Sequence, residues 1–201
     1  MFLNSKPLLY LQLLDRSLRY LVIHPKNHSI IDKGKLVFDT NILEDGCIVN
    51  APLLETRLDA LVKEMEKCKN AEAHILLLND FVTIREENIP SQLTPSEVRD
   101  YLELHISQSI RISIENPKFD FGFFEKNEYE QKIFIIAYSD DAVNLYQNIL
   151  QNVSLKPTVA DVSALSLYRV ANRRGTIKKD KDHHTLLLEW NPYDLSIMVF
   201  H

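Results

Sequence analysis

Residues 8–23, LLYLQLLDRSLRYLVI, contain two apolar runs separated by the polar tripeptide Asp15-Arg16-Ser17. Leucines at positions 11, 14, 18 and 21 also have helical spacing, so one helix through the segment is an alternative. Asp15 and Ser17 are turn-forming residues, Pro25 follows them, and residues 29–38 repeat the β-type pattern. The segment therefore predicts a hairpin that opens a three-stranded meander.

The last segment of the chain has the same arrangement. Residues 186–200, LLLEWNPYDLSIMVF, again contain an apolar run, a polar turn and a second apolar run. When residues 9–23 are superposed on residues 186–200, Gln12 and Glu189 occupy the same, fourth position. Two such hairpins indicate a duplicated β-meander core.

Helices and strands are predicted to alternate between the two hairpins, which is typical of an α/β protein. The predicted helices cover residues 50–65, 95–110, 139–153 and 164–172, and the predicted strands cover residues 73–78, 81–89, 119–123, 132–138 and 158–162. Residues 46–49 are predicted to be a short connector, and the charged run at 171–184 is predicted to be an exposed loop.

The second helix has the clearest start signal in the chain. Thr94, Pro95 and Glu97 supply an N-cap, a proline at the first helical position and the acid of a capping box. Leu93 and Val98 are spaced to form a hydrophobic staple across the same helix start.

Composition excludes several classes of function. The net charge of −5 argues against nucleic-acid binding, which requires a basic face. No window approaches the roughly 20 apolar residues of a membrane span, so direct membrane insertion is not expected. Cys47 and Cys68 fit reduced thiols of a cytosolic protein and do not form a metal site.

Two clusters have structural explanations that are preferred over functional ones. Asp182-His183-His184 follows the charged run and is interpreted as a solvated loop end, so no metal site is predicted there. Alternation along a strand places Phe119, Phe121 and Phe123 on one core face, with Phe124 pointing the other way.

The order of these elements is similar to that of the PilM family of type IV pilus assembly proteins. This family has the actin-like ATPase fold and is related to GspL-type secretion proteins and, more distantly, to FtsA. The segments that carry the resemblance are the opening hairpin, EDGCIV before the first helix, HILLLNDFVTIREENIP with Arg85 and Pro90, ENPKFDFGFFE, KIFIIAYSDDAVNLYQNIL, and LKPTVADVSALSLYRVAN with Lys156, Pro157 and Asp161.

The resemblance implies an α/β fold with an actin-like, ribonuclease H-like first lobe and an inserted strand–helix–strand–strand subdomain. Residues 1–80 would form the first part of the lobe and residues 81–154 the inserted subdomain. Residues 155–185 would return to the lobe and include the charged loop, and residues 186–201 would open a second lobe that is largely absent. On this basis the chain is expected to be the N-terminal part of a longer protein.

The nucleotide-binding loops of the family are degenerate in this chain. The first loop of the family has an acid, a glycine and small hydroxylated residues, whereas the corresponding residues here are Gln12, Leu14, Asp15, Arg16 and Ser17. The second hairpin keeps a carboxylate at Glu189 but has Asn191 and Pro192 in place of small residues. None of the four glycines lies in either turn, although a phosphate cradle requires close approach of the backbone. We therefore expect no bound nucleotide, no metal and no catalytic residue.

By resemblance, the chain would be a non-catalytic cytosolic scaffold of an inner-membrane platform for type IV pili, secretion or DNA uptake. Its partners would be the N-terminal peptide of a PilN-like single-pass membrane protein and other platform components, which would hold it at the inner face of the membrane. Arg85, Tyr101 and His105 are the candidate partner-binding residues, with a core or solvent-facing role as the alternative for each.

Two other functions remain open: an ATP- and Mg²⁺-binding ATPase of the same machinery, and a ribonuclease H-like metal-dependent nuclease. For the nuclease, Gln12 stands where the first carboxylate would be.

Overall fold

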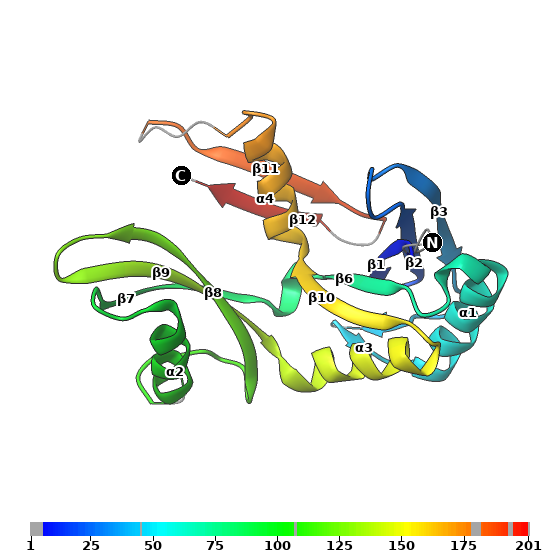
Figure 1. Ribbon diagram of the computed structural model, residues 1–201, viewed down its shortest axis with the longest axis horizontal. Helices are drawn as coiled ribbons and strands as arrows, with labels where there is room; N and C mark the ends of the chain where they lie inside the picture. Colours follow the sequence, from blue (N-terminus) through cyan, green and yellow to red (C-terminus); the bar gives the residue numbers. More distant parts are fainter. Residues whose placement is uncertain (1–5, 45, 107, 178–181, 193–194, 201) are drawn as a thin grey trace, which may run out of the picture. The chain divides into compact units, whose positions relative to one another are not determined.

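A computed structural model of the protein describes residues 6–44, 46–106, 108–177, 182–192 and 195–200. The chain forms two compact units, Met1–Asp80 with Tyr146–His201 (unit 1) and Phe81–Leu145 (unit 2). The elements in chain order are β1 (Leu8–Leu14), β2 (Ser17–Ile23), β3 (Ile30–Val37), β4 (Leu43–Glu44), β5 (Cys47–Ile48), α1 (Ala51–Glu64), η1 (Glu66–Cys68), β6 (Glu72–Leu77), η2 (Asn79–Phe81), β7 (Thr83–Pro90), α2 (Pro95–His105), β8 (Pro117–Lys126), β9 (Glu130–Ser139), α3 (Asp140–Asn152), β10 (Lys156–Val162), α4 (Ser163–Arg173), β11 (Thr185–Trp190) and β12 (Leu195–Phe200) (Figure 1).

Unit 1 is built on a mixed five-stranded sheet with the order β10-β6-β1-β2-β3. The first three strands form an antiparallel meander, while β6 and β10 run parallel to β1. The predicted opening hairpin is therefore confirmed, and the alternative of a single helix is wrong. Its turn consists of Asp15 and Arg16 alone, because Leu14 pairs with Ser17.

The core of unit 1 lies between this sheet and the helices α1 and α3. Alternation along β1 directs Leu9, Leu11 and Leu13 to one face, where each is at most 4% exposed. Helix α1 begins at the predicted residue, since the Asn50 side chain accepts a hydrogen bond from the Leu53 amide at 3.2 Å. Figure 1 shows α1 and α3 along the same side of the sheet, and a hydrogen bond of 2.8 Å from Asn152 to Glu55 joins them.

The final hairpin, β11 and β12, has one packed side and one open side. On the packed side, Phe200 lies with its ring centroid 4.8 Å from that of Tyr168 on α4. The open side presents only apolar side chains, arranged as three cross-strand pairs. Trp190 is 86% exposed and the other five are 54–61% exposed: Leu186, Leu188, Leu195, Ile197 and Val199.

Unit 2 is a three-stranded antiparallel sheet, β7-β9-β8, packed against α2. Its core contains Ile133 and Ile135 from the central strand and Val98 and Leu102 from the helix, all fully buried. The order β7, α2, β8, β9 confirms the predicted strand–helix–strand–strand arrangement.

The predicted capping box at the start of α2 is present. One carboxylate oxygen of Glu97 accepts hydrogen bonds from the Thr94 backbone amide at 2.8 Å and from the Thr94 hydroxyl at 2.7 Å. These two bonds stabilise the ionised carboxylate and lower the pKa of Glu97. Leu93 packs against the same core as Val98, which is consistent with the predicted staple.

The alternation predicted for the strand phenylalanines is confirmed, except that Phe123 is 46% exposed and lies outside the core. Phe119 and Phe121 pack against the core under α2, and Phe123 contacts the Phe121 ring with its centroid 5.6 Å away. The register of β8 shifts between Phe123 and Glu125. Phe124 instead lies against Phe134, with 5.0 Å between the ring centroids.

Two sequence predictions are wrong: the end of the second helix and the connector at residues 46–49. Helix α2 ends at His105 rather than at 110, because the His105 carbonyl accepts amide hydrogen bonds from Gln108, Ser109 and Ile110 and closes the helix in a turn. That turn buries Ile110 in the core of unit 2. The connector predicted at 46–49 belongs to a small hairpin of β4 and β5, which Gly46 permits through its positive φ of 68°.

Two of the four glycines lie within strands, where they make room for aromatic rings. A Cβ on Gly34 would lie 2.5 Å from the hydroxyl oxygen of Tyr20, and one on Gly122 would lie 2.3 Å from the ring of Phe134. Each ring thus crosses the neighbouring strand at a position that lacks a side chain.

The two cysteines differ in exposure. Cys47 is exposed and Cys68 is buried, and both are free thiols. Burial, together with the nearby Asp32 carboxylate, raises the pKa of the Cys68 thiol.

Asp182, His183 and His184 are exposed, and the charged positions 178–181 lie outside the described residues. Within the described ranges, no helix is long and apolar enough to cross a membrane.

The core of unit 2 leads to a testable prediction within one helix. Replacing the fully buried Leu102 with Ala is expected to lower the free energy of unfolding of unit 2 by about 2–5 kcal/mol, because it removes buried surface and leaves a cavity. Leu104→Ala, at a position 62% exposed, serves as the matched control and is expected to change it by less than about 0.5 kcal/mol. Hydrogen exchange of the β9 amides, recorded over a urea titration, measures the free energy of unfolding of both variants. Equal effects of the two substitutions would contradict this description of the core.

Candidate functional site

The candidate site lies at the carboxyl ends of the three parallel strands of unit 1. Strands β1, β6 and β10 end at Leu14, Leu77 and Val162, at the same edge of the sheet. Ligands of open α/β sheets bind at this edge. In this protein, polar residues from each strand end meet there, and the hydrogen-bond acceptor that they share is a side chain of the final hairpin.

The carboxylate of Glu189 on β11 is the centre of this polar network. Its Oε2 accepts a hydrogen bond of 2.5 Å from the hydroxyl of Ser163, the first residue of α4. Its Oε1 accepts a bond of 3.1 Å from the Gln12 amide on β1. The Asn79 amide, directly after β6, is a third and longer donor at 3.5 Å from Oε2. A residue from each of the three strand ends therefore donates to one carboxylate.

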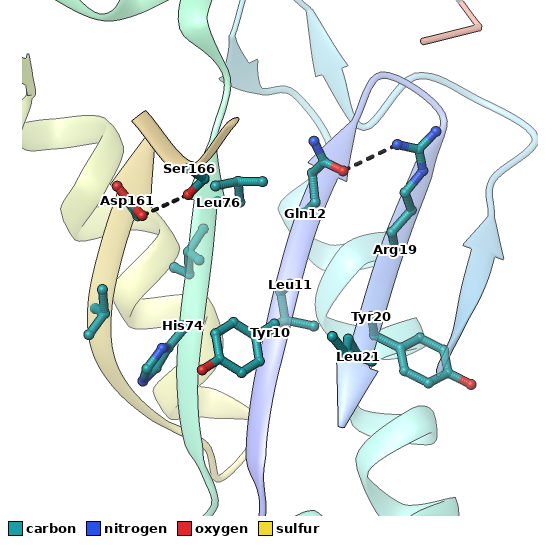
Figure 2. Close-up of a pocket in the computed structure, with 12 residues that line it drawn as sticks. Tyr10, Leu11, Gln12, Arg19, Tyr20, Leu21, His74, Leu76, Asp161 and Ser166 are labelled. Carbon is teal, nitrogen blue, oxygen red and sulfur yellow. Dashed lines mark hydrogen bonds between the residues drawn. The ribbon is translucent and has the colours of Figure 1, made fainter. Parts of the chain in front are cut away.

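Arg19 forms a second connection between the two hairpins. It is the cross-strand partner of Gln12, and its Nη1 donates to the Gln12 side-chain oxygen at 3.2 Å (Figure 2). The same nitrogen donates to the side-chain oxygen of Asn191 at 3.0 Å. Asn191 is 4% exposed, whereas Arg19 is only partly buried, so this contact is buried on the side of the final hairpin.

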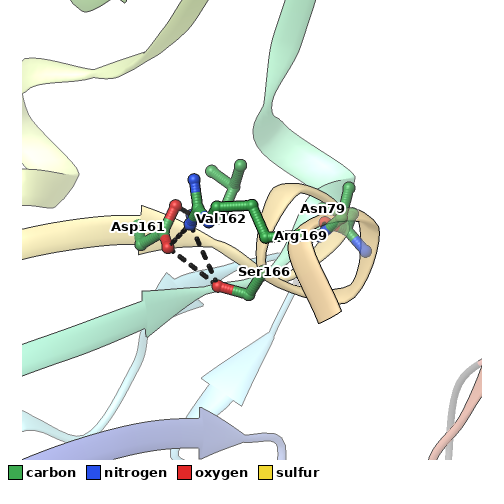
Figure 3. A network of polar contacts seen from close by, with 6 residues as sticks. Asn79, Asp161, Val162, Ser166 and Arg169 are labelled. Carbon is green, nitrogen blue, oxygen red and sulfur yellow. Dashed lines mark hydrogen bonds and ion pairs between the residues drawn. The ribbon is translucent and has the colours of Figure 1, made fainter. Parts of the chain in front are cut away.

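Helix α4 is attached to the same region by two further sets of contacts. The side-chain oxygen of Asn79 accepts the Ala164 backbone amide at 2.8 Å, which satisfies one of the free donors at the helix start. Asp161, at the end of β10, forms an ion pair with Arg169 and accepts a hydrogen bond of 2.8 Å from Ser166 (Figure 3). The position of Ser163 relative to Glu189 is thus set by residues on both sides of it.

The turn of the first hairpin is used for internal packing. The Asp15 carbonyl accepts amide hydrogen bonds from Ile42 at 2.6 Å and Leu43 at 3.3 Å, and the Arg16 carbonyl accepts one from Phe38 at 3.0 Å. The Arg16 side chain donates to Asn41 at 2.6 Å. Leu14 and Ser17, on either side of the turn, are buried. A phosphate cradle needs backbone amides directed at the ligand, whereas this turn directs carbonyls at residues 38–43 of its own chain.

The chemistry of this site is that of a clasp between two hairpins. At its centre, two amides and a hydroxyl donate to one carboxylate, and a guanidinium donates to the side-chain oxygens of two amides. Among the described residues, no group of three or more His, Cys, Asp or Glu side chains is placed to hold a metal ion. In the same part of the chain, every buried side-chain nitrogen and oxygen atom has a hydrogen-bond partner.

The three residues proposed from the sequence for partner binding lie in unit 2. Tyr101 and His105 are one turn apart on α2, and their rings stack with centroids 3.9 Å apart and planes 15° apart. Arg85, on β7, donates to Glu87 at 2.7 Å and to the Arg111 carbonyl at 2.8 Å. The structure therefore brings Tyr101 and His105 together and gives Arg85 separate contacts.

Three residues of the network were not identified from the sequence: Arg19, Asn79 and Ser163. Arg19 faces Gln12 across a two-residue turn, so counting outward from the turn would have paired them. Asn79 and Ser163 are polar residues that closely follow buried parallel strands, and this position is itself a signal for a site.

Comparisons with known proteins identify the fold. No protein-family model matches the chain, and no curated protein matches its sequence. Among solved structures, the chain is similar to one in a PilM–PilN type IV pilus biogenesis complex, with a TM-score of 0.75 and 18% identity over 95% of this chain and 57% of that one. A Bacteroides thetaiotaomicron protein, described as having an actin-like ATPase fold and unknown function, has a TM-score of 0.50 and 13% identity over 98% of this chain and 66% of its own. The cytoplasmic domain of EpsL, an inner-membrane component of the Vibrio cholerae type II secretion system, has a TM-score of 0.46 and 12% identity over 77% of this chain and 55% of its own.

The chain is therefore an actin-like α/β protein, and the predicted fold class is confirmed. Its fold is PilM-like, with a first lobe that contains an inserted subdomain. It spans 57% of the length of the matched chain in the PilM–PilN complex.

The contact between Ser163 and Glu189 yields a prediction about the final hairpin. Ser163→Ala removes a charge-assisted donor from a partly buried carboxylate and is expected to lower the free energy of hairpin opening by about 1–3 kcal/mol. Faster hydrogen exchange of the amides paired between β11 and β12 would report the change. Ser166→Ala, which removes a hydroxyl of the same helix that contacts Asp161, is the control and is expected to leave that exchange unchanged. Equal exchange in both variants and the wild type would contradict the role given to Ser163.

Proposed function

We propose that this chain is a cytosolic scaffold of an inner-membrane platform for type IV pili or a related secretion or DNA-uptake machine. In this role it binds the N-terminal peptide of a PilN-like single-pass membrane protein, which holds it at the inner face of the membrane with other platform components. The observation that carries the proposal is the similarity, over 95% of this chain, to a chain of a complex between PilM and PilN.

The geometry of the strand-end network supports a non-catalytic role. An actin-like nucleotide site needs backbone amides and a metal-holding carboxylate that are open to a triphosphate. In this protein the Glu189 carboxylate already accepts hydrogen bonds from Gln12 and Ser163, and the first turn presents carbonyls to its own chain. Opening the site to nucleotide would require breaking several of these contacts at once.

The partner-binding surface that we propose includes Arg85, Tyr101 and His105 of unit 2. The stacked rings of Tyr101 and His105 form a flat, partly exposed surface on α2, and aromatic side chains of this kind are common in binding hot spots. The guanidinium of Arg85 is partly exposed beside Glu87, where it could also pair with a carboxylate of the peptide.

Binding of the membrane partner is tested directly with the peptide. The synthetic N-terminal segment of a PilN-like protein from the same organism is expected to bind the chain with a Kd on the order of micromolar in calorimetry. Tyr101→Ala is expected to weaken this binding about tenfold, because it removes one ring of the stack. Tyr129→Ala, an aromatic 76% exposed in the same unit, is the control. Absence of binding to the wild-type chain would refute the scaffold proposal, whereas unchanged binding in Tyr101→Ala would refute only this placement of the site.

The non-catalytic part of the proposal has its own measurement. Titration of Mg²⁺-ATP into the chain is expected to show no binding up to about 1 mM, because the strand-end donors are already engaged by Glu189. Micromolar binding that is lost in Gln12→Ala or Glu189→Ala would establish the ATPase alternative instead.

A further inference from the structure

The five-stranded sheet of unit 1 has a second face that differs from the one packed against α1 and α3. Parallel strands are normally covered on both faces, and β1, β6 and β10 are parallel. On the packed face, Leu9, Ala73 and Ile75 are at most 7% exposed. On the other face, the neighbouring residues Tyr10, His74 and Leu76 are only partly buried. The strands thus have the apolar character of a sheet that is covered on this side as well.

This second face contains a groove with a volume of about 360 Å³. It runs across β10, β6, β1 and β2, and Figure 2 shows its lining side chains. The ring of Tyr10 meets His74 edge-on with 4.8 Å between centroids, and Leu21 lies beside Tyr10 on the next strand. Val159, at the β10 side, is 44% exposed. The volume and the mostly apolar lining are those of a binding groove with a few polar groups at one end.

The β2 and β3 side of this face is basic. Arg19 lines the groove, and the strand register places Lys35 beside Arg19 and Lys33 beside Leu21, on the same side of the sheet. In the described part of the chain, the Arg19 guanidinium forms hydrogen bonds to two amide oxygens and no ion pair. Three cations therefore flank an apolar groove in a protein whose net charge is −5.

Two carboxylates near the groove are engaged by other side chains of the chain. Asp161 forms an ion pair with Arg169, and Glu189 accepts bonds from Gln12 and Ser163. At the far end of the same face, Glu72 is the register neighbour of Lys156. The cations of this face, Arg19, Lys33 and Lys35, lie on its β2 and β3 side.

We propose that this face binds an amphipathic helix of another polypeptide, whose apolar stripe fills the groove and whose acidic residues pair with Arg19, Lys33 and Lys35. A helix fits better than a strand because the groove offers side chains on a sheet face, whereas an added strand needs the free backbone of a sheet edge. The acidic flank follows from charge complementarity with the three cations. The surface lies within unit 1, whereas Arg85, Tyr101 and His105 lie in unit 2, so this inference and the proposed function can fail separately.

The test uses a designed probe and the full chain. The probe is a fluorescently labelled helical peptide of about four turns, with leucines at i, i+3, i+4 and i+7 spacing and glutamates along one flank. Binding is followed by fluorescence anisotropy at low and high salt. A second peptide with lysine in place of each glutamate tests the sign of the charge.

The expected results separate apolar from charged contacts. Val159→Asp is expected to weaken binding of the acidic peptide about tenfold, because it places a charge at the apolar rim of the groove. Lys35→Glu is expected to weaken it about threefold and to reduce its salt dependence. Lys26→Glu, the same charge change at an exposed loop position, is the matched control and is expected to have little effect. The lysine peptide is expected to bind at least about tenfold more weakly than the acidic one.

Three results would overturn the proposal. They are equal binding of the two peptides, acidic-peptide binding that is unchanged in both Val159→Asp and Lys35→Glu, and no detectable binding of the acidic peptide. Light scattering tests a different occupant: a dimer of the chain that Val159→Asp dissociates would assign this face to a second copy instead.

Discussion

The carboxylate of Glu189 is the point at which the separate parts of unit 1 meet. A partly buried carboxylate is costly unless several donors surround it, and here they come from β1, from the residue after β6 and from the start of α4. Two of those donors are in turn held by other contacts: Gln12 by Arg19, and Asn79 by the Ala164 amide in the first turn of α4. Removing the carboxylate would leave these donors without the acceptor that they share.

Under the proposed non-catalytic role, this arrangement gives the strand-end donors of an actin-like fold an acceptor within the chain. The carboxyl ends of parallel strands collect polar groups wherever the sheet has this topology, and those groups need an acceptor. In this protein the acceptor is part of the chain, so the strand ends are satisfied without phosphate. Gln12 fits this role, because an amide can donate to Glu189 where an acid would repel it. Two of the glycines, Gly34 and Gly122, allow aromatic rings to cross strands.

The parts of the fold that follow from local pattern could be predicted from the sequence. The opening hairpin follows from two apolar runs around Asp15 and Ser17, and the start of α2 follows from Thr94 and Glu97. The strand–helix–strand–strand order of unit 2 was also predictable. The end of α2 was not, because three amides converge on the His105 carbonyl to bury Ile110, a tertiary effect that the periodicity does not contain. The network at Glu189 was only half predicted. Gln12 and Glu189 were identified as matching positions, but the pattern does not show that Ser163 donates to Glu189, 26 residues away, or that Arg19 donates to Asn191, 172 residues away.

The open side of the final hairpin has a consequence for how the chain behaves in a cell. Strand β12, with the sequence LSIMVF, has no charge, no proline and high β-propensity, and together with Trp190 it forms an uninterrupted apolar surface. Short uncharged segments of this kind stack readily with copies of themselves and form steric zippers. Exposed apolar surfaces are also what chaperones and proteases act on. The amount of the free chain that remains in solution, and its lifetime, therefore depend on how much of this hairpin is covered.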